Sequence, residues 1–241
     1  MMTRSLVALA MCLSWMLVGC SGRTENSSNV TTQTQSGKYP THWWAPIPEA
    51  DAASWEILPQ AANDGEVIVS KRNELGLLSN FAHTPFEFRG KHYESLEGFW
   101  QMMKYPESPS DERATFPGIK WLHSREQVAQ MIGHQAKSAG TAASENMKQM
   151  RINWVTFEGK RMPYRTPEKG EHYNLIVEAT RAKVQQNPNV SKVLRSTGNL
   201  ILRPDHNQAE DAPPAWRYCD IIMEIREEIC IWHTGSQRAC K

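Results

Sequence analysis

A carboxylate, an amide and an amine stand at helical spacing in the first half of the chain. Glu97, Gln101 and Lys104 are four and three residues apart, so at about 100° per residue they project from one side of a helix. The residues between them are largely apolar, as a helix with one buried side requires. This polar stripe is the best candidate for chemistry in the sequence. The same periodicity also fits an amphipathic helix that turns these three side chains toward solvent.

A short pair of strands is predicted immediately before this helix. Residues 86–88 and 92–93 flank Arg89-Gly90-Lys91. Gly90 supplies the turn that a short strand pair requires. We therefore expect the helix to start from a fixed support.

The other regular elements predicted by periodicity and capping signals are mostly helices. They are a helix over 124–133 with Ser124 as N-cap and Gln127 as its capping-box partner, helices over 171–187, 190–195 and 218–232, and a strand over 200–202. Helices dominate, and the strands are few and short. The sequence therefore predicts an α+β fold, a single mostly α-helical domain with a few short strands.

The amino terminus has the pattern of an export signal. Arg4 precedes an apolar stretch over residues 6–18 that is too short to span a bilayer. The stretch leads into Leu17-Val18-Gly19-Cys20, an order that resembles the lipobox of bacterial lipoproteins. That resemblance implies a signal peptide over 1–19 and attachment of diacylglyceryl and acyl chains such as palmitate to Cys20. Ser21 implies an outer-membrane location, and the alternative is an ordinary signal peptide in which Cys20 is incidental.

Composition divides the rest of the chain into a tether and a domain. Residues 21–41 are rich in Ser, Thr, Asn and Gln, so this segment cannot bury enough apolar surface to fold. We interpret residues 20–42 as the lipidated cysteine and a flexible tether that holds a domain clear of the membrane. Residues 43–241 have the size of one ordinary domain, with its core over about 68–232.

The charge pattern argues against one class of partner and leaves two readings open. The formal net charge is +1, so the chain does not have the excess of basic residues that is typical of a general nucleic-acid binder. Basic residues gather over 148–203 and acidic residues over 205–228. This distribution suits a phosphate-bearing small ligand held near carboxylates, and it suits equally two oppositely charged elements packed together.

The cysteines and histidines give no sign of a metal. Three cysteines follow Cys20, and a bridge between Cys230 and Cys240 is compatible with export, whereas Cys219 is too far from Cys230 along a helix to pair with it. The spacing of the cysteines does not match a zinc site, and the histidines are dispersed. We therefore expect no metal and no cofactor.

An ordered series of motifs resembles the NADAR family, the YbiA-like N-glycosidases. The opening motif consists of Leu78-Ser79-Asn80-Phe81, Pro85-Phe86, Gly90, Tyr93, Ser95, Glu97, Gln101 and Lys104. Later matches are Ala136-Lys137 with Gly140, Trp154 with Met162, Ala182-Lys183, Gln186-Asn187, Leu194, Thr197-Gly198 and Leu202. The resemblance spans about 68–229, nearly the whole predicted domain.

The resemblance implies hydrolysis of an N-glycosidic bond at ribose. Family members act on ribosylamino-pyrimidine phosphates or remove ADP-ribose from guanine. Positive charge develops at the anomeric carbon as the bond breaks, so a carboxylate must lie nearby, and the leaving base needs a proton. The resemblance implies Glu97 and Asp211 as the catalytic acids. It implies Asn80, Gln101, Lys104 and Trp154 as substrate-binding residues, with Lys104 on phosphate or as an amine that attacks the opened sugar, and Trp154 as a ring for the base or sugar.

Several positions depart from the family pattern. The usual histidine after the glutamate is Gly98, Arg203 or Pro204 replaces a late glutamate, and the segment from Asp211 to Arg217 is two residues longer. Extra residues also occur between 105 and 120 and over 163–170. These departures support an alternative, a catalytically degenerate lipoprotein that binds a nucleotide-like ligand or an envelope partner without turnover.

Overall fold

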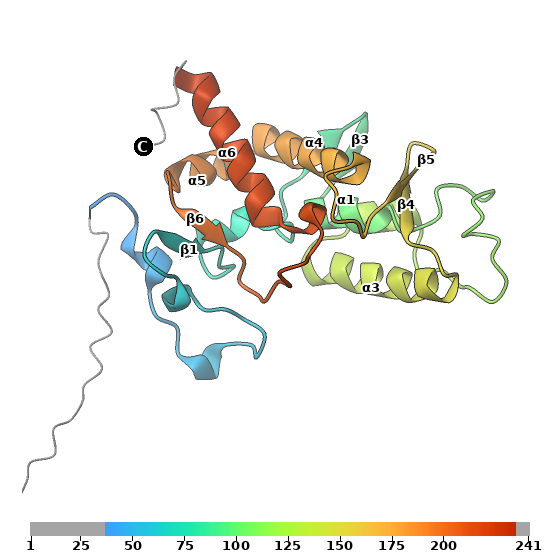
Figure 1. Ribbon diagram of the computed structural model, residues 1–241, viewed down its shortest axis with the longest axis horizontal. Helices are drawn as coiled ribbons and strands as arrows, with labels where there is room; N and C mark the ends of the chain where they lie inside the picture. The colour runs from blue at the N-terminus through green and yellow to red at the C-terminus, as the bar shows by residue number, and fades with distance from the viewer. Residues whose placement is uncertain (1–36, 235–241) are drawn as a thin grey trace, which may run out of the picture. The chain divides into compact units, whose positions relative to one another are not determined.

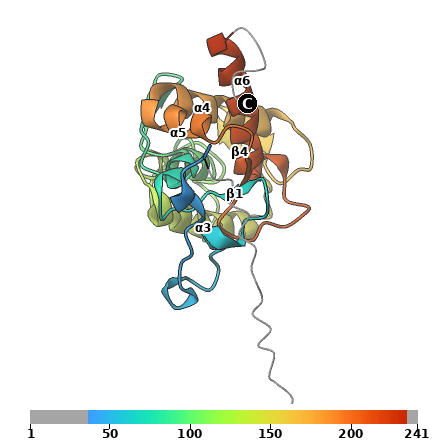
Figure 2. The same cartoon turned by 90° about the vertical axis from the view of Figure 1, so that its left-hand side faces the viewer.

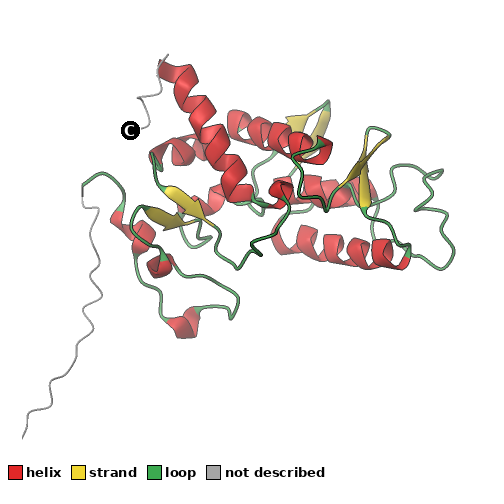
Figure 3. Cartoon of the chain, in the orientation of Figure 1, coloured by secondary structure: helices red, strands yellow, loops and turns green. Residues whose placement is uncertain are grey.

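Six α-helices and six short strands make up residues 37–234, the part of the chain that the computed structural model describes. The helices are α1 (Leu96–Met102), α2 (Arg125–Ala129), α3 (Gly133–Gln149), α4 (Glu171–Gln186), α5 (Pro188–Ser196) and α6 (Tyr218–Thr234). The strands are β1 (Glu66–Ile68), β2 (Phe86–Phe88), β3 (Lys91–Tyr93), β4 (Trp154–Phe157), β5 (Lys160–Pro163) and β6 (Ile201–Arg203). Helices dominate, as Figure 3 shows, so the predicted mostly helical α+β class is confirmed.

Short 3₁₀ helices complete the connections. They are η1 (Thr41–Trp44), η2 (Glu49–Asp51), η3 (Pro59–Ala61), η4 (Glu74–Leu78) and η5 (Pro214–Trp216). The predicted signal peptide, Cys20 and the tether up to residue 36 lie outside the described residues. No helix among residues 37–234 is long and apolar enough to cross a membrane.

The described strands form three separate pairs. β2–β3 and β4–β5 are antiparallel hairpins, whereas β1 pairs in parallel with β6, with Val67 opposite Leu202. The expected strand pair before the first helix is therefore confirmed, and its turn residues Arg89 and Gly90 have φ angles of 50° and 73°. Successive residues at positive φ are what a tight hairpin turn requires.

Helix α1 lies at the centre of the helical layers. It packs against α2, α3 and α4, with α4 above it and α3 below it in Figure 1. In Figure 2, after a 90° turn, α4 and α5 again lie above α3. The N-cap Ser95 ties α1 to this surround because its Oγ accepts from Gly98 N at 2.9 Å and donates to Met131 O at 2.8 Å.

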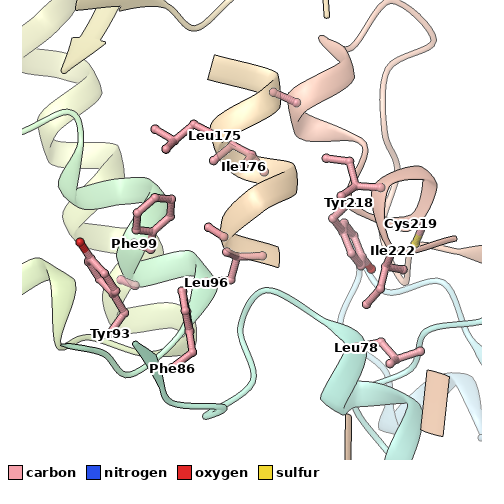
Figure 4. Packing of buried hydrophobic residues seen from close by; sticks show 14 of the residues in the cluster. Leu78, Phe86, Tyr93, Leu96, Phe99, Leu175, Ile176, Tyr218, Cys219 and Ile222 are labelled. Carbon is pink, nitrogen blue, oxygen red and sulfur yellow. The ribbon is translucent and has the colours of Figure 1, made fainter. Parts of the chain in front are cut away.

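An aromatic cluster joins α1 to its hairpin. Phe86 and Tyr93 face each other across β2 and β3, and both rings contact Phe99 on α1, with a Tyr93–Phe99 centroid distance of 4.9 Å. Figure 4 shows these three side chains and Leu96 gathered around the start of the helix. Burial of such large apolar side chains supplies the main free energy of folding, so the hairpin is a fixed support for the helix, as expected.

One predicted helix end was wrong, and one long helix was not predicted. The helix predicted over 124–133 has the expected Ser124–Gln127 capping box but ends at Ala129, and Gly133 begins α3 instead of ending α2. Helix α3 was missed because its buried side consists largely of alanine and glycine, which do not mark a buried helix face as large apolar residues do. The later elements agree with prediction, including α4, α5, β6 and α6.

The folded part begins inside the segment interpreted as a tether. Tyr39 is buried, and its hydroxyl donates to Asn199 Oδ1 at 2.6 Å. Its ring packs against those of Trp43 and Trp44 in η1. The tether interpretation over residues 20–42 therefore extends four residues too far, over 39–42, because a single tyrosine in a polar segment gives no periodic signal.

Candidate functional site

The polar stripe lines a cavity of about 770 Å³. Its walls come from α1, from the start of α3, and from three connecting segments around residues 55–81, 164–165 and 206–218. A cavity of roughly 300–1,000 Å³ is typical of small-molecule sites. The structure therefore brings residues that are distant in sequence to one concave surface around the predicted chemistry.

Glu97 is a buried carboxylate at the wall of this cavity. Only 4% of the residue is exposed, and its Oε1 accepts from Gln101 Nε2 at 2.7 Å. Burial raises the pKa of the Glu97 carboxyl, while the hydrogen bond from Gln101 and the charges of Lys137 and Lys104 oppose that rise. Glu97 and Gln101 belong to the cavity wall and are not solvated, so the interpretation of the stripe as a wet helix face is wrong.

Lys104 follows the helix but stays on the same side. Helix α1 ends at Met102, and Lys104 Nζ donates to Gly140 O at 3.2 Å and to Ser144 Oγ at 2.9 Å. Burial lowers the pKa of Lys104 to about 8, with nearby Glu97 opposing the shift. The site thus holds a carboxyl and an amine whose pKa values have moved toward each other.

The segment after α1 is fixed by a residue that sequence reasoning missed. Arg113 is fully buried, and its Nη1 donates to Met103 O at 3.0 Å and Lys104 O at 3.2 Å. Its Nη2 also donates to Asp111 Oδ2 at 2.7 Å. Arg113 belongs to the extra residues between 105 and 120, so that insertion holds the backbone of Lys104 in place.

Gly140 is required by the close approach of α3 to α1. A Cβ atom there would overlap the side-chain amide of Gln101. The buried Gln101 Oε1 has no hydrogen-bond partner among the described residues, while Nε2 is committed to Glu97. Glycine at position 140 therefore lets Gln101 keep the orientation in which it supports the carboxylate.

Gly98 points away from the cavity, which corrects its interpretation as a lost site residue. A Cβ atom at position 98 would lie 2.5 Å from Met131 O and 2.9 Å from Val128 O. Both are backbone atoms and cannot move aside as a flexible side chain would. A histidine at this position would have no room in this structure, so Gly98 serves the packing of α1 against α2 and the chain that follows it.

Asn80 supports Glu97 through its backbone. Asn80 O accepts from Glu97 N at 3.0 Å, and Asn80 itself lines the cavity. The loop is fixed from behind because Lys183 Nζ donates to Ser79 O at 2.7 Å. Lys183 is fully buried, and that burial lowers its pKa to about 7.

Of two further predicted site residues, Asp211 lies at the cavity and Trp154 does not. Asp211 is exposed and contributes to the cavity wall. Trp154 lies in β4 and is not among the residues that line the cavity; Arg113 and Arg161 lie over its ring, 4.8 Å and 4.2 Å from the centroid. The structure therefore gathers Glu97, Gln101, Lys104, Asn80 and Asp211 at one cavity and leaves Trp154 out.

A different tryptophan occupies the cavity wall. Trp216 lines the cavity with Tyr164 and Arg165, and the Arg165 guanidinium lies 5.4 Å from each of the two ring centroids. Trp216 belongs to the altered segment after Asp211, which was the signal that could have identified it. Arg165 and Lys137, both lining the cavity, are cations that could hold phosphate there.

Packing explains part of the uneven charge distribution. Acidic residues of α6 pair with basic residues of α4 and the chain before it, through Lys169–Glu224 and Arg181–Glu228, both at 2.7 Å. Arg203 pairs with Glu66 across the β1–β6 strand pair. The interpretation as two oppositely charged elements packed together accounts for these residues.

The described cysteines are one free thiol and one disulfide-bonded residue, and neither belongs to a metal site. Cys219 is a free buried thiol whose pKa is raised by burial. Cys230 is disulfide-bonded, and its predicted partner Cys240 lies outside the described residues. Within residues 37–234, no group of three or more histidine, cysteine, aspartate or glutamate side chains could hold a metal ion.

Comparison with known proteins finds one similarity. No protein-family model and no curated protein matches the chain. Among solved structures, the chain is similar to the NMR structure of the E. coli protein YbiA, with 19% sequence identity and a TM-score of 0.41 over 70% of this chain and 88% of that chain.

Proposed function

We propose that this protein is a lipid-anchored N-glycosidase of the NADAR type, which hydrolyses the N-glycosidic bond of a ribosyl-phosphate or ADP-ribosyl compound. The observation that carries the proposal is Glu97, a carboxyl buried at the wall of a ligand-sized cavity and oriented by Gln101. A buried carboxyl with perturbed acidity in a cavity is the arrangement that acid–base catalysis requires.

The raised pKa of Glu97 suits the first half of the reaction. A carboxyl that keeps its proton to higher pH can donate that proton to the leaving base as the bond from nitrogen to the anomeric carbon breaks. The resulting carboxylate then lies beside the positive charge at that carbon and stabilises it. Water adds its oxygen to the carbon and returns its proton to Glu97, which completes the cycle.

The cations around the cavity suit the phosphate of such a substrate. Lys104, Lys137 and Arg165 line the same cavity as Glu97. Arg165 is oriented by the rings of Tyr164 and Trp216, and guanidinium groups bind phosphate oxygens in a bidentate manner. The phosphate anchors the sugar while Glu97 acts on its anomeric carbon.

Exchange of Glu97 tests the proposed activity. The full-length chain and the Glu97→Gln variant are incubated with ADP-ribosyl guanine compounds and ribosylamino-pyrimidine phosphates, and release of base is measured by chromatography. We expect hydrolysis by the parent and a rate about 10²- to 10⁴-fold lower in the variant, the usual effect of removing a general acid. Glu145→Gln, a change at an exposed position of α3, is the control and should leave the rate unchanged.

Two outcomes would contradict the catalytic proposal. One is no release of base by the parent from any of these compounds, and the other is equal rates for the parent and Glu97→Gln. Calorimetric binding of ADP-ribose without turnover would support the alternative of a nucleotide-binding lipoprotein. The departure at Gly98 no longer favours that alternative, because the position faces a packed helix junction.

The location is proposed from the amino-terminal pattern Leu17-Val18-Gly19-Cys20. Lipid on Cys20 would anchor the domain in the bacterial envelope, most simply at the outer membrane. The test is to measure how much of the parent and of the Cys20→Ser protein is found in the outer-membrane fraction of cells that make them. Retention of the Cys20→Ser protein in the outer membrane at the parent's level would rule the anchor out.

A further inference from the structure

A loop before the family-like region contributes an aromatic side chain to the cavity. Trp55 lies between η2 and η3, outside the span of about 68–229 that carries the motif resemblance. It lines the cavity and is 48% exposed. A large apolar side chain left this open in a ligand-sized cavity is informative, because tryptophan usually buries most of its surface.

The backbone on either side of Trp55 is firmly attached to the domain. Glu56 accepts two hydrogen bonds from Arg72, both at 2.7 Å, and Ile57 N donates to Asp205 O at 2.8 Å. Gln60 and Ile47 close the base of the loop, with Gln60 Nε2 donating to Ile47 O at 2.8 Å. The indole is therefore presented by a preorganised loop, which lowers the entropic cost of binding a ligand.

Other aromatic rings stand beside Trp55 at the cavity wall. His134 lies 6.3 Å from the Trp55 ring and 5.2 Å from the Phe81 ring, both edge-on. Lys71 Nζ lies 5.9 Å from the Trp55 centroid and 5.3 Å from that of Phe81, and it pairs with Asp205. Nearly half of Trp55 remains exposed with Lys71 in this position, so the indole keeps surface for a further planar partner.

A buried hydroxyl adds a polar feature to the same wall. Tyr218 lines the cavity, and its buried OH lies beside the backbone of Asp205 and the thiol of Cys219. Its ring stacks on His206, which joins the Trp55 loop through the Glu56–His206 bridge. The rings of Tyr218 and His206 therefore extend the aromatic wall on which Trp55 lies.

We infer that Trp55 and the rings beside it bind the nucleobase of an ADP-ribosyl ligand, while the Glu97 part of the cavity takes the ribose whose bond is cleaved. This inference rests on the proposed function and narrows it to a substrate with a second planar group. Stacking suits any base, whereas a ribosyl monophosphate would leave Trp55 without a partner. Asn207 and Gln208, which also line the cavity, supply amide groups that can bond the edge of a base.

Calorimetric titration of the full-length chain in mild detergent tests this inference. The ligands are ADP-ribose and ribose 5-phosphate, and the proteins are the parent, Trp55→Ala, Trp55→Phe and Phe116→Ala. Phe116 is the matched control, because it is 41% exposed and does not line the cavity. We expect Trp55→Ala to weaken ADP-ribose binding by about 5- to 100-fold, the range for loss of one base–aromatic stack.

The other measurements separate stacking from a general change of the site. Ribose 5-phosphate should bind the parent and Trp55→Ala within about twofold of each other, Trp55→Phe should restore most of the ADP-ribose affinity, and Phe116→Ala should match the parent. Equal ADP-ribose affinity in the parent and Trp55→Ala would overturn the inference, as would equal losses for both ligands or no binding of ADP-ribose by the parent. Hydrolysis of ribosylamino-pyrimidine phosphates in a Glu97-dependent manner would leave the proposed function intact in each of these cases.

Discussion

The two sides of helix α1 are both buried, yet they carry opposite kinds of residue. One side presents Glu97 and Gln101 to the cavity, where the carboxylate and amide bond each other. The other side presents Gly98 and Phe99 to backbone carbonyls and aromatic rings. Burial alone therefore does not distinguish the site from the core in this protein. The two are distinguished by whether the buried groups are polar or apolar.

The difference has an energetic consequence. Apolar contacts on the packing side stabilise the fold. On the cavity side, removal of a carboxyl and an amine from water costs free energy that a few hydrogen bonds only partly offset. The raised pKa of Glu97 and the lowered pKa of Lys104 both reflect that cost. Changes on the cavity side should thus alter activity and pH dependence, while changes on the packing side should alter stability.

Glu97→Gln has the largest expected effect on activity, and Lys104→Met should remove a pH-dependent contribution to the free energy of unfolding. The folded-state pKa of Lys104, about 8, lies below its ordinary value of 10.5. Between these values the unfolded chain binds more protons, so this residue makes the free energy of unfolding rise with pH by at most about 3 kcal/mol. In Lys104→Met this contribution is absent.

Urea unfolding of the parent and Lys104→Met at several values from pH 7 to 10.5 measures the contribution. We expect the stability of the variant relative to the parent to be greatest below pH 8 and to fall as the pH rises. Lys148→Met, at an exposed position of α3, is the control and should give a difference that does not vary with pH. A flat difference for Lys104→Met as well would mean that burial of the amine carries no cost.

Local signals in the sequence were sufficient to predict several helices and the hairpin around the polar stripe. The hairpin at Gly90, the capping box of Ser124 and the long helix α4 were all predicted, because a turn residue, a cap or large apolar residues at helical spacing mark each of them. The spacing of Glu97, Gln101 and Lys104 correctly placed them on one side. Periodicity gives directions relative to the helix only, so it could not show that this side faces a cavity.

The features that could not be predicted from the sequence depend on contacts between segments that are distant in the chain. Helix α3 escaped prediction because close packing selects small residues such as Ala136 and Gly140 on its buried side. Trp55 gave no signal, because nothing in the local sequence shows that its loop reaches the cavity. Trp154 was assigned from resemblance alone, and the structure places it under two arginine side chains instead.

Gly98→Ala tests the packing side directly. A methyl group would lie 2.5 Å from Met131 O, and relief of that overlap requires movement of the backbone. Such overpacking costs about 1–3 kcal/mol, against a gain of about 1 kcal/mol from the better helix propensity of alanine. We expect a net loss in the free energy of unfolding of up to about 2 kcal/mol, measured by urea denaturation.

A histidine at position 98, which the NADAR pattern has there, gives a second variant for this test. Gly98→His should be less stable than Gly98→Ala and should not raise the rate of hydrolysis, because a larger side chain meets the same carbonyls of Met131 and Val128. Gly170→Ala is the matched control, since a Cβ atom at Gly170 would meet no atom within 4 Å. If Gly98→Ala were more stable than the parent, propensity would outweigh packing and α1 would not lie this close to α2. If Gly98→His increased the rate, position 98 would belong to the cavity side, and the separation of α1 into two sides would be wrong at this residue.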